Sequence, residues 1–173
     1  MHFEARHRFN GSVEQVERAM LDDRYLDFLL KHHGVLLEAQ AISKSVEGTL
    51  VKRKIRYRPK PVIESIGPRK VPPEYFAFIE ESTYDSVKKE LRFKNTATSQ
   101  TIANMMINTG VLRLREVGGQ CERTLDGEIS LKLPFLLKPI AVIGEAVIQR
   151  EGLKILDAEQ AVLNRFIAEV LNA

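Results

Sequence analysis

The sequence predicts an α+β fold in which seven antiparallel strands form one sheet, two short helices follow the first strand, and a long helix ends the chain. Three observations lead to this prediction. Apolar residues alternate in residues 2–9, extended segments separated by turn signals fill residues 35–133, and apolar residues recur at helical spacing after Pro134. Successive hairpins imply an antiparallel sheet with one covered face.

The opening segment predicts a strand and two short helices. Within residues 2–9, Phe3, Ala5, His7 and Phe9 share one face, which is the period of a half-buried strand. Residues 12–15, Ser-Val-Glu-Gln, have the form of a capping box and predict the start of a helix. A second short helix is expected before the pair His32-His33 and the glycine that follows it.

Six further strands are predicted between residues 35 and 133. They are 35–46, 49–58, 74–84, 91–98, 105–117 and 121–133. Glycines mark the turns at Gly48 and at Gly118-Gly119, the second of which is the clearest hairpin signal in the chain. Five prolines lie between residues 59 and 73, so this connection cannot be a continuous helix or a central strand.

The C-terminal segment 136–171 has apolar residues at helical spacing and predicts a helix. A straight helix of this length would measure about 50 Å at 1.5 Å per residue, which exceeds the width of a small domain. A glycine lowers helix stability by about 1 kcal/mol relative to alanine. We therefore expect the helix to bend or break near Gly152.

Length and composition predict one domain spanning residues 1–173, because 173 residues can bury one core and are too few for two ordinary domains. The chain is 44% hydrophobic and 28% charged, which is an ordinary globular mixture. Its single cysteine, Cys121, excludes an internal disulfide. The first residues lack the pattern of a signal peptide, and no uncharged stretch reaches the ~18 residues needed to cross a bilayer. We expect a soluble cytoplasmic protein.

Basic residues concentrate in one segment. Between residues 44 and 70, nine Lys or Arg stand against two Glu, whereas the net charge of the whole chain is only +3. Such a segment can attract the phosphates of a membrane surface. The simpler interpretation is a solvated hairpin edge guarded by Lys and Arg.

The order of elements resembles the START-like or SRPBCC superfamily, with the Bet v 1-type helix-grip fold, over essentially the whole chain. Residues 3–9, 12–33 and 35–133 and the helix after Pro134 carry this resemblance. Within it, Ile-Glu-Glu-Ser-Thr-Tyr-Asp at 79–85 and Leu-Arg-Phe-Lys-Asn-Thr at 91–96 are similar to PRELI-type phospholipid-transfer proteins and to an uncharacterised bacterial START-like family.

The superfamily resemblance implies a curved sheet that wraps the long helix and leaves an apolar cavity between them. Members bind lipids, sterols, hormones or polyketides, and a minority are cyclases, aromatase-like enzymes or hydroxylase subunits. Strand periodicity then assigns side chains to the face toward the cavity. The predicted ligand-binding residues are Arg53, Ile55, Tyr57, Phe93, Asn95, Met106, Asn108, Leu112, Leu125 and Ile129.

Arg53 is the charged residue most firmly assigned to this apolar face, and a buried charge needs a partner. One hypothesis is that Arg53 meets an acidic head group of the ligand, because a guanidinium suits carboxylate or phosphate geometry. The alternatives are an ion pair with Glu80 or Glu81, or a side chain that reaches solvent at the end of the strand.

No catalytic or metal-binding motif is present: the nucleophile elbow, the P-loop, the dinucleotide fingerprint and HExxH are all missing. His7 is interpreted as a core histidine. The adjacent His32 and His33 lack the i, i+4 spacing of a helical metal pair, and Cys121 has no histidine nearby in sequence. We predict no catalytic residue, no metal and no cofactor.

These patterns predict a protein that binds a lipid, fatty acid or similar hydrophobic molecule in the cavity, as a carrier, transfer protein or sensor. Two alternatives stay open: a cyclase- or aromatase-like enzyme that uses the same cavity, and a ligand-free interaction module. The basic segment 44–70 could make transient contact with an anionic membrane. No nucleic-acid partner is expected, and the sequence indicates neither the ligand's identity nor an oligomeric state.

Overall fold

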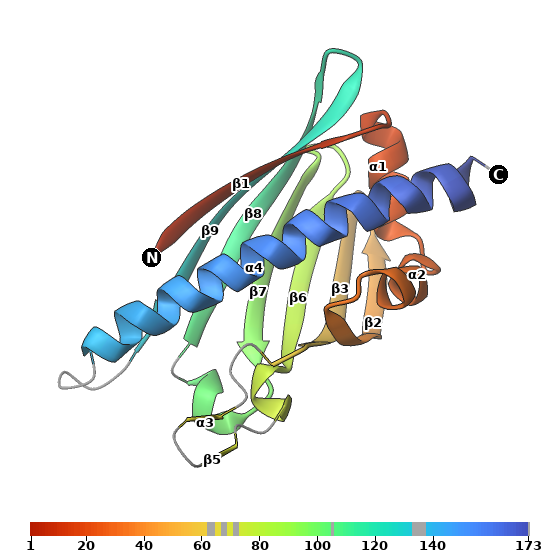
Figure 1. Cartoon of the computed structure of the whole chain (residues 1–173). Helices are drawn as coiled ribbons and strands as arrows, with labels where there is room; N and C mark the ends of the chain where they lie inside the picture. Colours follow the sequence, from red (N-terminus) through yellow and green to blue (C-terminus); the bar gives the residue numbers. More distant parts are fainter. Residues whose placement is uncertain (62–64, 67–68, 71–72, 105, 133–137, 173) are drawn as a thin grey trace.

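The computed structural model describes residues 1–61, 65–66, 69–70, 73–104, 106–132 and 138–172 (Figure 1). Seven long strands account for most of it: β1 (His2–Phe9), β2 (Leu36–Glu47), β3 (Leu50–Pro59), β6 (Phe78–Asp85), β7 (Glu90–Ala97), β8 (Met106–Val117) and β9 (Gln120–Leu131). The helices are α1 (Val13–Leu21), α2 (Tyr25–His32), α3 (Gln100–Ala103) and α4 (Lys138–Phe166), and α4 continues into a π-helical turn at Ile167–Leu171.

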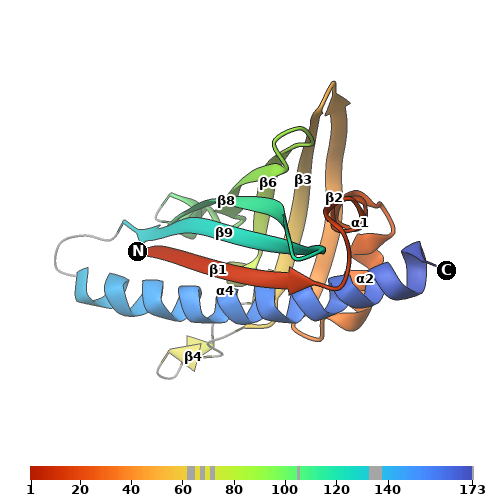
Figure 2. The same cartoon turned by 90° about the horizontal axis from the view of Figure 1, so that it is seen from above.

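The seven long strands form one curved antiparallel sheet in the order β1-β9-β8-β7-β6-β3-β2. The two short strands β4 (Ser65–Ile66) and β5 (Arg69–Lys70) pair with each other in a separate ribbon. Figure 1 shows α4 crossing the concave side of the sheet, and Figure 2 shows it running alongside β1. The predicted fold class is confirmed, including the two early helices and the terminal helix.

Local sequence signals set the first helix and the turns. Ser12 Oγ accepts a hydrogen bond from the Gln15 backbone N–H at 3.3 Å, and Gln15 Oε1 accepts from the Ser12 N–H at 2.9 Å, which completes the predicted capping box. Between β8 and β9, Gly118 and Gly119 have φ angles of +62° and +80°. A two-residue hairpin turn with positive φ at both positions favours glycine, so this turn forms where the sequence predicted it.

Of the bend or break predicted near Gly152, the break is wrong, because α4 runs through this residue without interruption from Lys138 to Phe166. Among the described residues, its close backbone neighbours are β1, β9, α1 and α2. Packing of a helix against its neighbours supplies most of its stability, and here it outweighs the weak helix propensity of one glycine.

One boundary and one additional element differ from the predictions in the middle of the chain. Residues Pro73–Phe76 form a single 3₁₀ turn, so β6 begins at Phe78 and not at residue 74. Proline suits the first turn of a helix because it needs no N–H donor there. The four-residue α3 was not predicted, since it is too short to show a periodic pattern. The predicted strand ends at residues 105 and 133, and residues 62–64, 67–68 and 71–72 of the proline-rich connection, lie outside the described residues.

A buried ion-pair network joins α4 to the sheet. Arg123 on β9 is only 1% exposed, and its Nη1 donates to Glu159 Oε2 of α4 at 2.8 Å. Its Nη2 lies 3.4 Å from His7 Nδ1, and its guanidinium lies 5.1 Å from the ring centre of Phe9. His7 Nε2 is 3.0 Å from Asp157 Oδ1. His7 is therefore a core histidine with two polar partners, as predicted.

A row of two glycines and two aromatic residues crosses the sheet. Phe93 pairs with Gly110, Gly110 with Gly127, and Gly127 with Phe3 on four neighbouring strands. A Cβ atom on Gly110 would lie 2.6 Å from Cζ of Phe93, and one on Gly127 would overlap the ring of Phe3. The absence of two side chains therefore makes room for two rings on the same face of the sheet.

We expect Gly127→Ala to lower the free energy of unfolding by about 1–3 kcal/mol, because the ring of Phe3 must move away from the new methyl group. Gly152→Ala is the matched control. A Cβ there meets nothing within 4 Å, so the helix should gain up to about 1 kcal/mol. Urea unfolding followed by circular dichroism measures both, and a stabilising effect of Gly127→Ala would contradict this account.

Candidate functional site

The ten residues predicted to bind a ligand share one face of the sheet, here called the inner face. The strand register places them in neighbouring positions, as in the cross-strand row Ile55, Glu80, Asn95, Asn108 and Ile129. Leu112, Leu125 and Ile129 of this face belong to one apolar cluster with Leu163 and Phe166 of α4. The inner face is therefore the concave side on which α4 lies.

The inner face is covered unevenly. Ile55, Leu112, Leu125 and Ile129 are buried. Six of the predicted residues are only half-buried, although they lie on the same side of the sheet as α4: Arg53, Tyr57, Phe93, Asn95, Met106 and Asn108. Because α4 packs most closely on β1 and β9, the strands β3, β6, β7 and β8 keep accessible surface beneath it. That these residues bind a ligand stays a prediction.

Three polar residues stand side by side at the middle of the inner face, and we call them the inner polar row. Glu80 on β6 pairs with Asn95 on β7, which pairs with Asn108 on β8. The row ends at an isoleucine on each side, Ile55 on β3 and Ile129 on β9. Sequence reasoning included the two asparagines but not Glu80, because the inner positions of β6 (Phe78, Glu80, Ser82, Tyr84) mix apolar and polar residues.

The two asparagines have unsatisfied hydrogen-bonding groups. Asn95 Oδ1 and Asn108 Oδ1 are shielded from solvent and have no hydrogen-bond partner among the described residues. A buried polar atom without a partner costs about 1–3 kcal/mol, and native proteins contain few of them. Their concentration on one face marks it as a candidate binding surface.

The ionisable groups of the inner face have shifted pKa values. Burial raises the pKa of the Glu80 carboxyl above its ordinary value, and the positive charge of Arg53 offsets part of this shift. Burial also raises the pKa of the Tyr57 hydroxyl well above its ordinary value, with a further increase from the nearby charge of Glu80. Both shifts favour the neutral forms, in which each group can donate a hydrogen bond.

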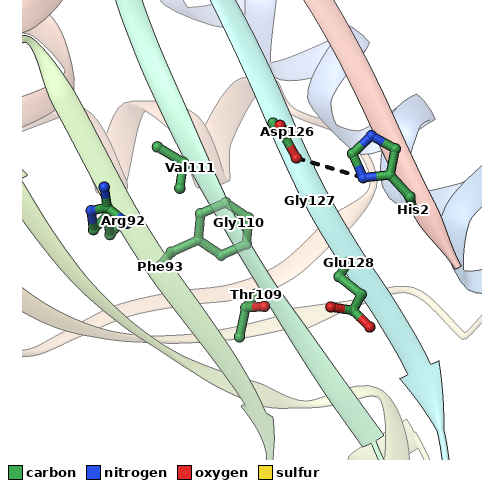
Figure 3. A pocket seen from close by; sticks show the side chains of 9 residues that line it. All are labelled: His2, Arg92, Phe93, Thr109, Gly110, Val111, Asp126, Gly127 and Glu128. Atoms are coloured by element: carbon green, nitrogen blue, oxygen red, sulfur yellow. Dashed lines mark ion pairs between the residues drawn. The ribbon is translucent and has the colours of Figure 1, made fainter.

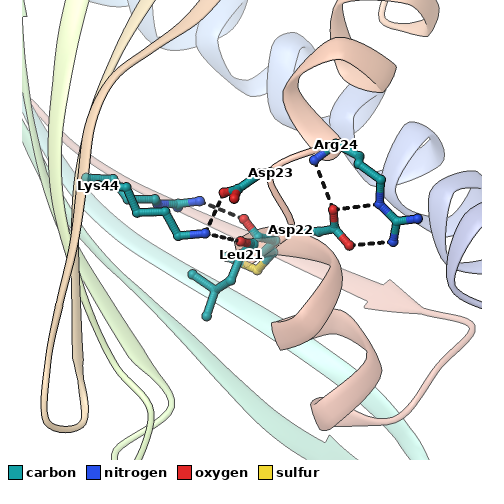
Figure 4. Close-up of polar contacts among 7 residues, drawn as sticks. Leu21, Asp22, Asp23, Arg24 and Lys44 are labelled. Carbon is teal, nitrogen blue, oxygen red and sulfur yellow. Dashed lines mark hydrogen bonds and ion pairs between the residues drawn. The ribbon is translucent and has the colours of Figure 1, made fainter.

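Arg53 binds the end of a helix and not a carboxylate. Its Nη1 donates to the Met20 carbonyl at 2.6 Å, in the last turn of α1. Lys44, its cross-strand partner, donates to the Leu21 carbonyl at 2.8 Å and lies 2.5 Å from Asp23 Oδ1 (Figure 4). The last carbonyls of a helix lack intrahelical donors and carry partial negative charge, so the two cations stabilise this end of α1.

The alternative of an ion pair between Arg53 and Glu80 or Glu81 is not found within the described residues. Glu81 points to the opposite face and lies 2.5 Å from Lys54 Nζ, and no contact of 4.0 Å or less joins Arg53 to Glu80. Alternation along β6 explains the result for Glu81, and the competing carbonyl of Met20 explains the result for Glu80. Arg53 Nε is buried without a partner in the described part of the chain.

The basic segment carries more negative neighbours than its sequence indicates. Its cations pair with carboxylates from other elements: Lys44 with Asp23, Lys54 with Glu81, Arg56 with Glu38, and Arg58 with Glu38 and Glu74. These pairs reduce the charge available to an anionic surface. Membrane contact through residues 44–70 stays a prediction.

A shallow depression of about 390 Å³ lies on the outer face of the sheet (Figure 3). Its lining includes Arg92, Thr109, Val111, Asp126 and Glu128, and His2 Nδ1 lies 3.6 Å from Asp126 Oδ1 across it. A second depression, of about 360 Å³, lies on the β2–β3 hairpin and is lined by Lys52, Lys54, Glu81 and neighbouring residues. Phe93 also lines the first depression and Arg53 and Ser82 the second, and charged side chains stand among the lining residues of both.

Other candidate chemistry is weak in the described part of the chain. Cys121 is buried, and burial raises the pKa of its thiol to about 11, so the thiol stays protonated near neutral pH. No three His, Cys, Asp or Glu side chains in this part are grouped to hold a metal ion. Likewise, none of its helices combines the length and the apolar character needed to cross a bilayer.

Solved structures with the same architecture confirm the predicted fold. A protein from Thermus thermophilus, TTHA0849, has 15% identity and a TM-score of 0.64, over 94% of this chain and 97% of that one. The Zhui aromatase/cyclase from a Streptomyces species has 12% identity and a TM-score of 0.61, over 96% and 95%. A norcoclaurine synthase from Thalictrum flavum has 12% identity and a TM-score of 0.62, over 98% and 94%.

At these identities the likeness shows the fold alone, which is the helix-grip fold. The finer resemblance to PRELI-type proteins stays a prediction. A comparison with curated proteins found no match. The family model described as "Protein of unknown function (DUF2505)" matches residues 4–167. The chain therefore belongs to the DUF2505 family.

Proposed function

We propose that this protein binds a hydrophobic small molecule between the inner face of the sheet and α4, as a carrier, transfer protein or sensor. The observation that carries the proposal is the inner polar row. Half-buried asparagine and glutamate side chains lie among apolar ones, on a face that α4 packs against most closely at β1 and β9. Binding sites for small molecules have this composition, mostly apolar with a few polar groups.

The unsatisfied polar atoms support a binding site over a closed interaction module. A closed interior would be more stable if Asn95 and Asn108 were apolar, because burying their unpaired oxygens is unfavourable. A ligand that hydrogen-bonds to these atoms would remove the penalty in the bound state. Relief of the unfavourable burial of these oxygens would then contribute to the free energy of ligand binding.

Proteins of the same fold include binders and catalysts of small organic molecules. One solved structure of the norcoclaurine synthase from Thalictrum flavum contains dopamine and hydroxybenzaldehyde, and it aligns over 98% of this chain. Others are aromatase/cyclases. These proteins of the same fold support a small organic molecule as the kind of ligand proposed for this chain.

A second candidate function is acid–base catalysis by Glu80. A carboxyl whose pKa is raised by burial can exchange protons with a bound substrate. Glu80 lies on the inner face beside Asn95, which could orient a substrate next to it. Turnover of a bound molecule that is lost in Glu80→Gln, with binding retained, would favour this candidate over a carrier.

A bulky side chain in the inner polar row should block binding. We expect Asn108→Trp to abolish the binding of a neutral hydrophobic dye such as Nile red, measured by fluorescence titration, because the indole occupies the space beneath α4. Thr109→Trp is the matched control: the neighbouring residue points to the outer face, so it should leave the dye affinity within about twofold.

Thermal unfolding of both variants shows whether they are folded. Equal dye affinity in wild type, Asn108→Trp and Thr109→Trp would contradict the proposed site. Loss of binding in both variants, with both folded, would place the dye on the outer face.

Glu80→Gln should change how stability depends on pH. Because the folded-state pKa of Glu80 is raised, its carboxyl favours the folded state most below its ordinary pKa of 4.5 and loses this contribution as pH rises through the folded-state pKa. Relative to wild type, Glu80→Gln should therefore become more stable as pH rises from about 4 to 8, as measured by urea unfolding.

Glu81→Gln is the control, with the opposite sign. The hydrogen bond and charge of Lys54 lower the pKa of Glu81, so its contribution is present above pH 4.5 and is lost as pH falls through the folded-state pKa. A pH-independent difference between wild type and Glu80→Gln would show that the Glu80 carboxyl is not shifted.

A further inference from the structure

We propose that the inner polar row of Glu80, Asn95 and Asn108 recognises a neutral, hydroxyl-bearing ligand and discriminates against anionic ones. This inference rests on the proposed function and specifies the chemistry of its ligand. It replaces the expectation of an acidic head group bound to Arg53 with recognition at a different place on the inner face.

The first step is the position of the three residues. They are direct cross-strand partners on β6, β7 and β8. Neighbouring strands lie about 4.8 Å apart, so the row extends over about 10 Å, comparable to the length of a two-ring molecule. The buried Ile55 and Ile129 end the row, and Phe93 and Met106 occupy the next inner positions along β7 and β8. A polar strip framed by apolar side chains suits a largely apolar ligand with few polar atoms.

The second step is the hydrogen-bonding capacity of the row. Asn95 Oδ1 and Asn108 Oδ1 are acceptors without a donor, and the two amides, although they are cross-strand partners, do not bond to each other. A ligand hydroxyl can donate to one of these oxygens and accept from an amide N–H or from a protonated carboxyl. A carboxylate or a phosphate dianion can only accept, so it leaves both asparagine oxygens unpaired.

The third step is charge. Within the described residues, Arg53 is the cation that acts on Glu80; its Nη1 is bound to the Met20 carbonyl at the end of α1, and its Nε is left without a partner. The other buried cation on this side of the sheet, Arg123, is paired with Glu159 at 2.8 Å. An anion placed in the row would lie against the partial negative charge of the two unpaired asparagine carbonyl oxygens. Neutral ligands avoid both this repulsion and the cost of burying a charge.

The test compares three probes with the same two-ring body: 2-naphthol, 2-methylnaphthalene and 2-naphthoate. Their affinities are measured by displacement of Nile red at pH 7.5. For the wild-type protein we expect 2-naphthol to bind about tenfold more tightly than 2-methylnaphthalene, and 2-naphthoate to bind most weakly.

The variant Asn95→Leu/Asn108→Leu replaces both amides by apolar groups of similar shape. It should bind 2-naphthol and 2-methylnaphthalene within about twofold of each other, and its melting temperature should equal or exceed that of wild type. Thr109→Val, on the outer face, is the control that should keep the wild-type preference. A rise in melting temperature combined with loss of the preference separates a recognition role from a structural one.

The possible outcomes distinguish failure of the inference on ligand chemistry from failure of the proposed function. Equal affinities for the three probes in wild type, or a preference that survives in the double leucine variant, would overturn the inference and leave the proposed function standing. Tightest binding of 2-naphthoate would overturn it in favour of the Arg53 hypothesis. Failure of Nile red and of all three probes to bind the wild-type protein would overturn the proposed function, and the inference with it.

Discussion

The structure depends on a mismatch of widths between one helix and seven strands. Six strand spacings of about 4.8 Å make the sheet about 29 Å wide, whereas a helix with its side chains is about 10–12 Å across. Curvature brings the edges of the sheet toward α4, and α1 and α2 cover part of the same side. A single helix still cannot cover every inner strand equally. The half-buried residues of β3, β6, β7 and β8 follow from this geometry.

Buried polar contacts determine which strands α4 covers. The ion pair of Arg123 with Glu159 and the contact of His7 with Asp157 attach α4 to β9 and β1. A buried ion pair adds little net stability over apolar packing, but removing one partner is strongly destabilising. Such a pair therefore holds the helix at a defined place more than it strengthens the fold. At the other side of the sheet, Arg53 and Lys44 fasten the end of α1 to β3 and β2.

Most of the fold could be predicted from the sequence because its signals are local. Alternation located the seven strands, the capping box located α1, and paired glycines located the β8–β9 turn. The predictions failed where the local preference of the chain competes with tertiary packing. Gly152 weakens α4 only by its intrinsic propensity, and packing of the helix outweighs it. The 3₁₀ turn before β6 depends on the fixed backbone geometry of proline, which the alternation of apolar and polar residues does not reveal.

The candidate site was predictable only as a set of residues facing one way. Periodicity placed Asn95 and Asn108 inward, but it does not tell which strands are neighbours or which register they adopt. Glu80 joins the two asparagines only through the pairing of β6 with β7. In the same way, the choice of Arg53 between a carboxylate and a helix end depends on where α1 finishes relative to β3. Both facts are tertiary, so one sequence could not supply them.

The inner polar row is where the demands of folding and of binding differ most. Folding alone favours apolar residues beneath α4, since unpaired amide oxygens and a buried carboxyl lower the stability of the free protein. Elsewhere on the concave side the chain has a buried apolar cluster from Phe3 to Ile129 and onto α4, interrupted by the buried His7 and Arg123, whose side chains have polar partners. The exceptions are concentrated at the strands that the single helix covers least. A fold that cannot close over its own sheet has accessible surface there, and polar atoms without partners at that place are available to bind a ligand.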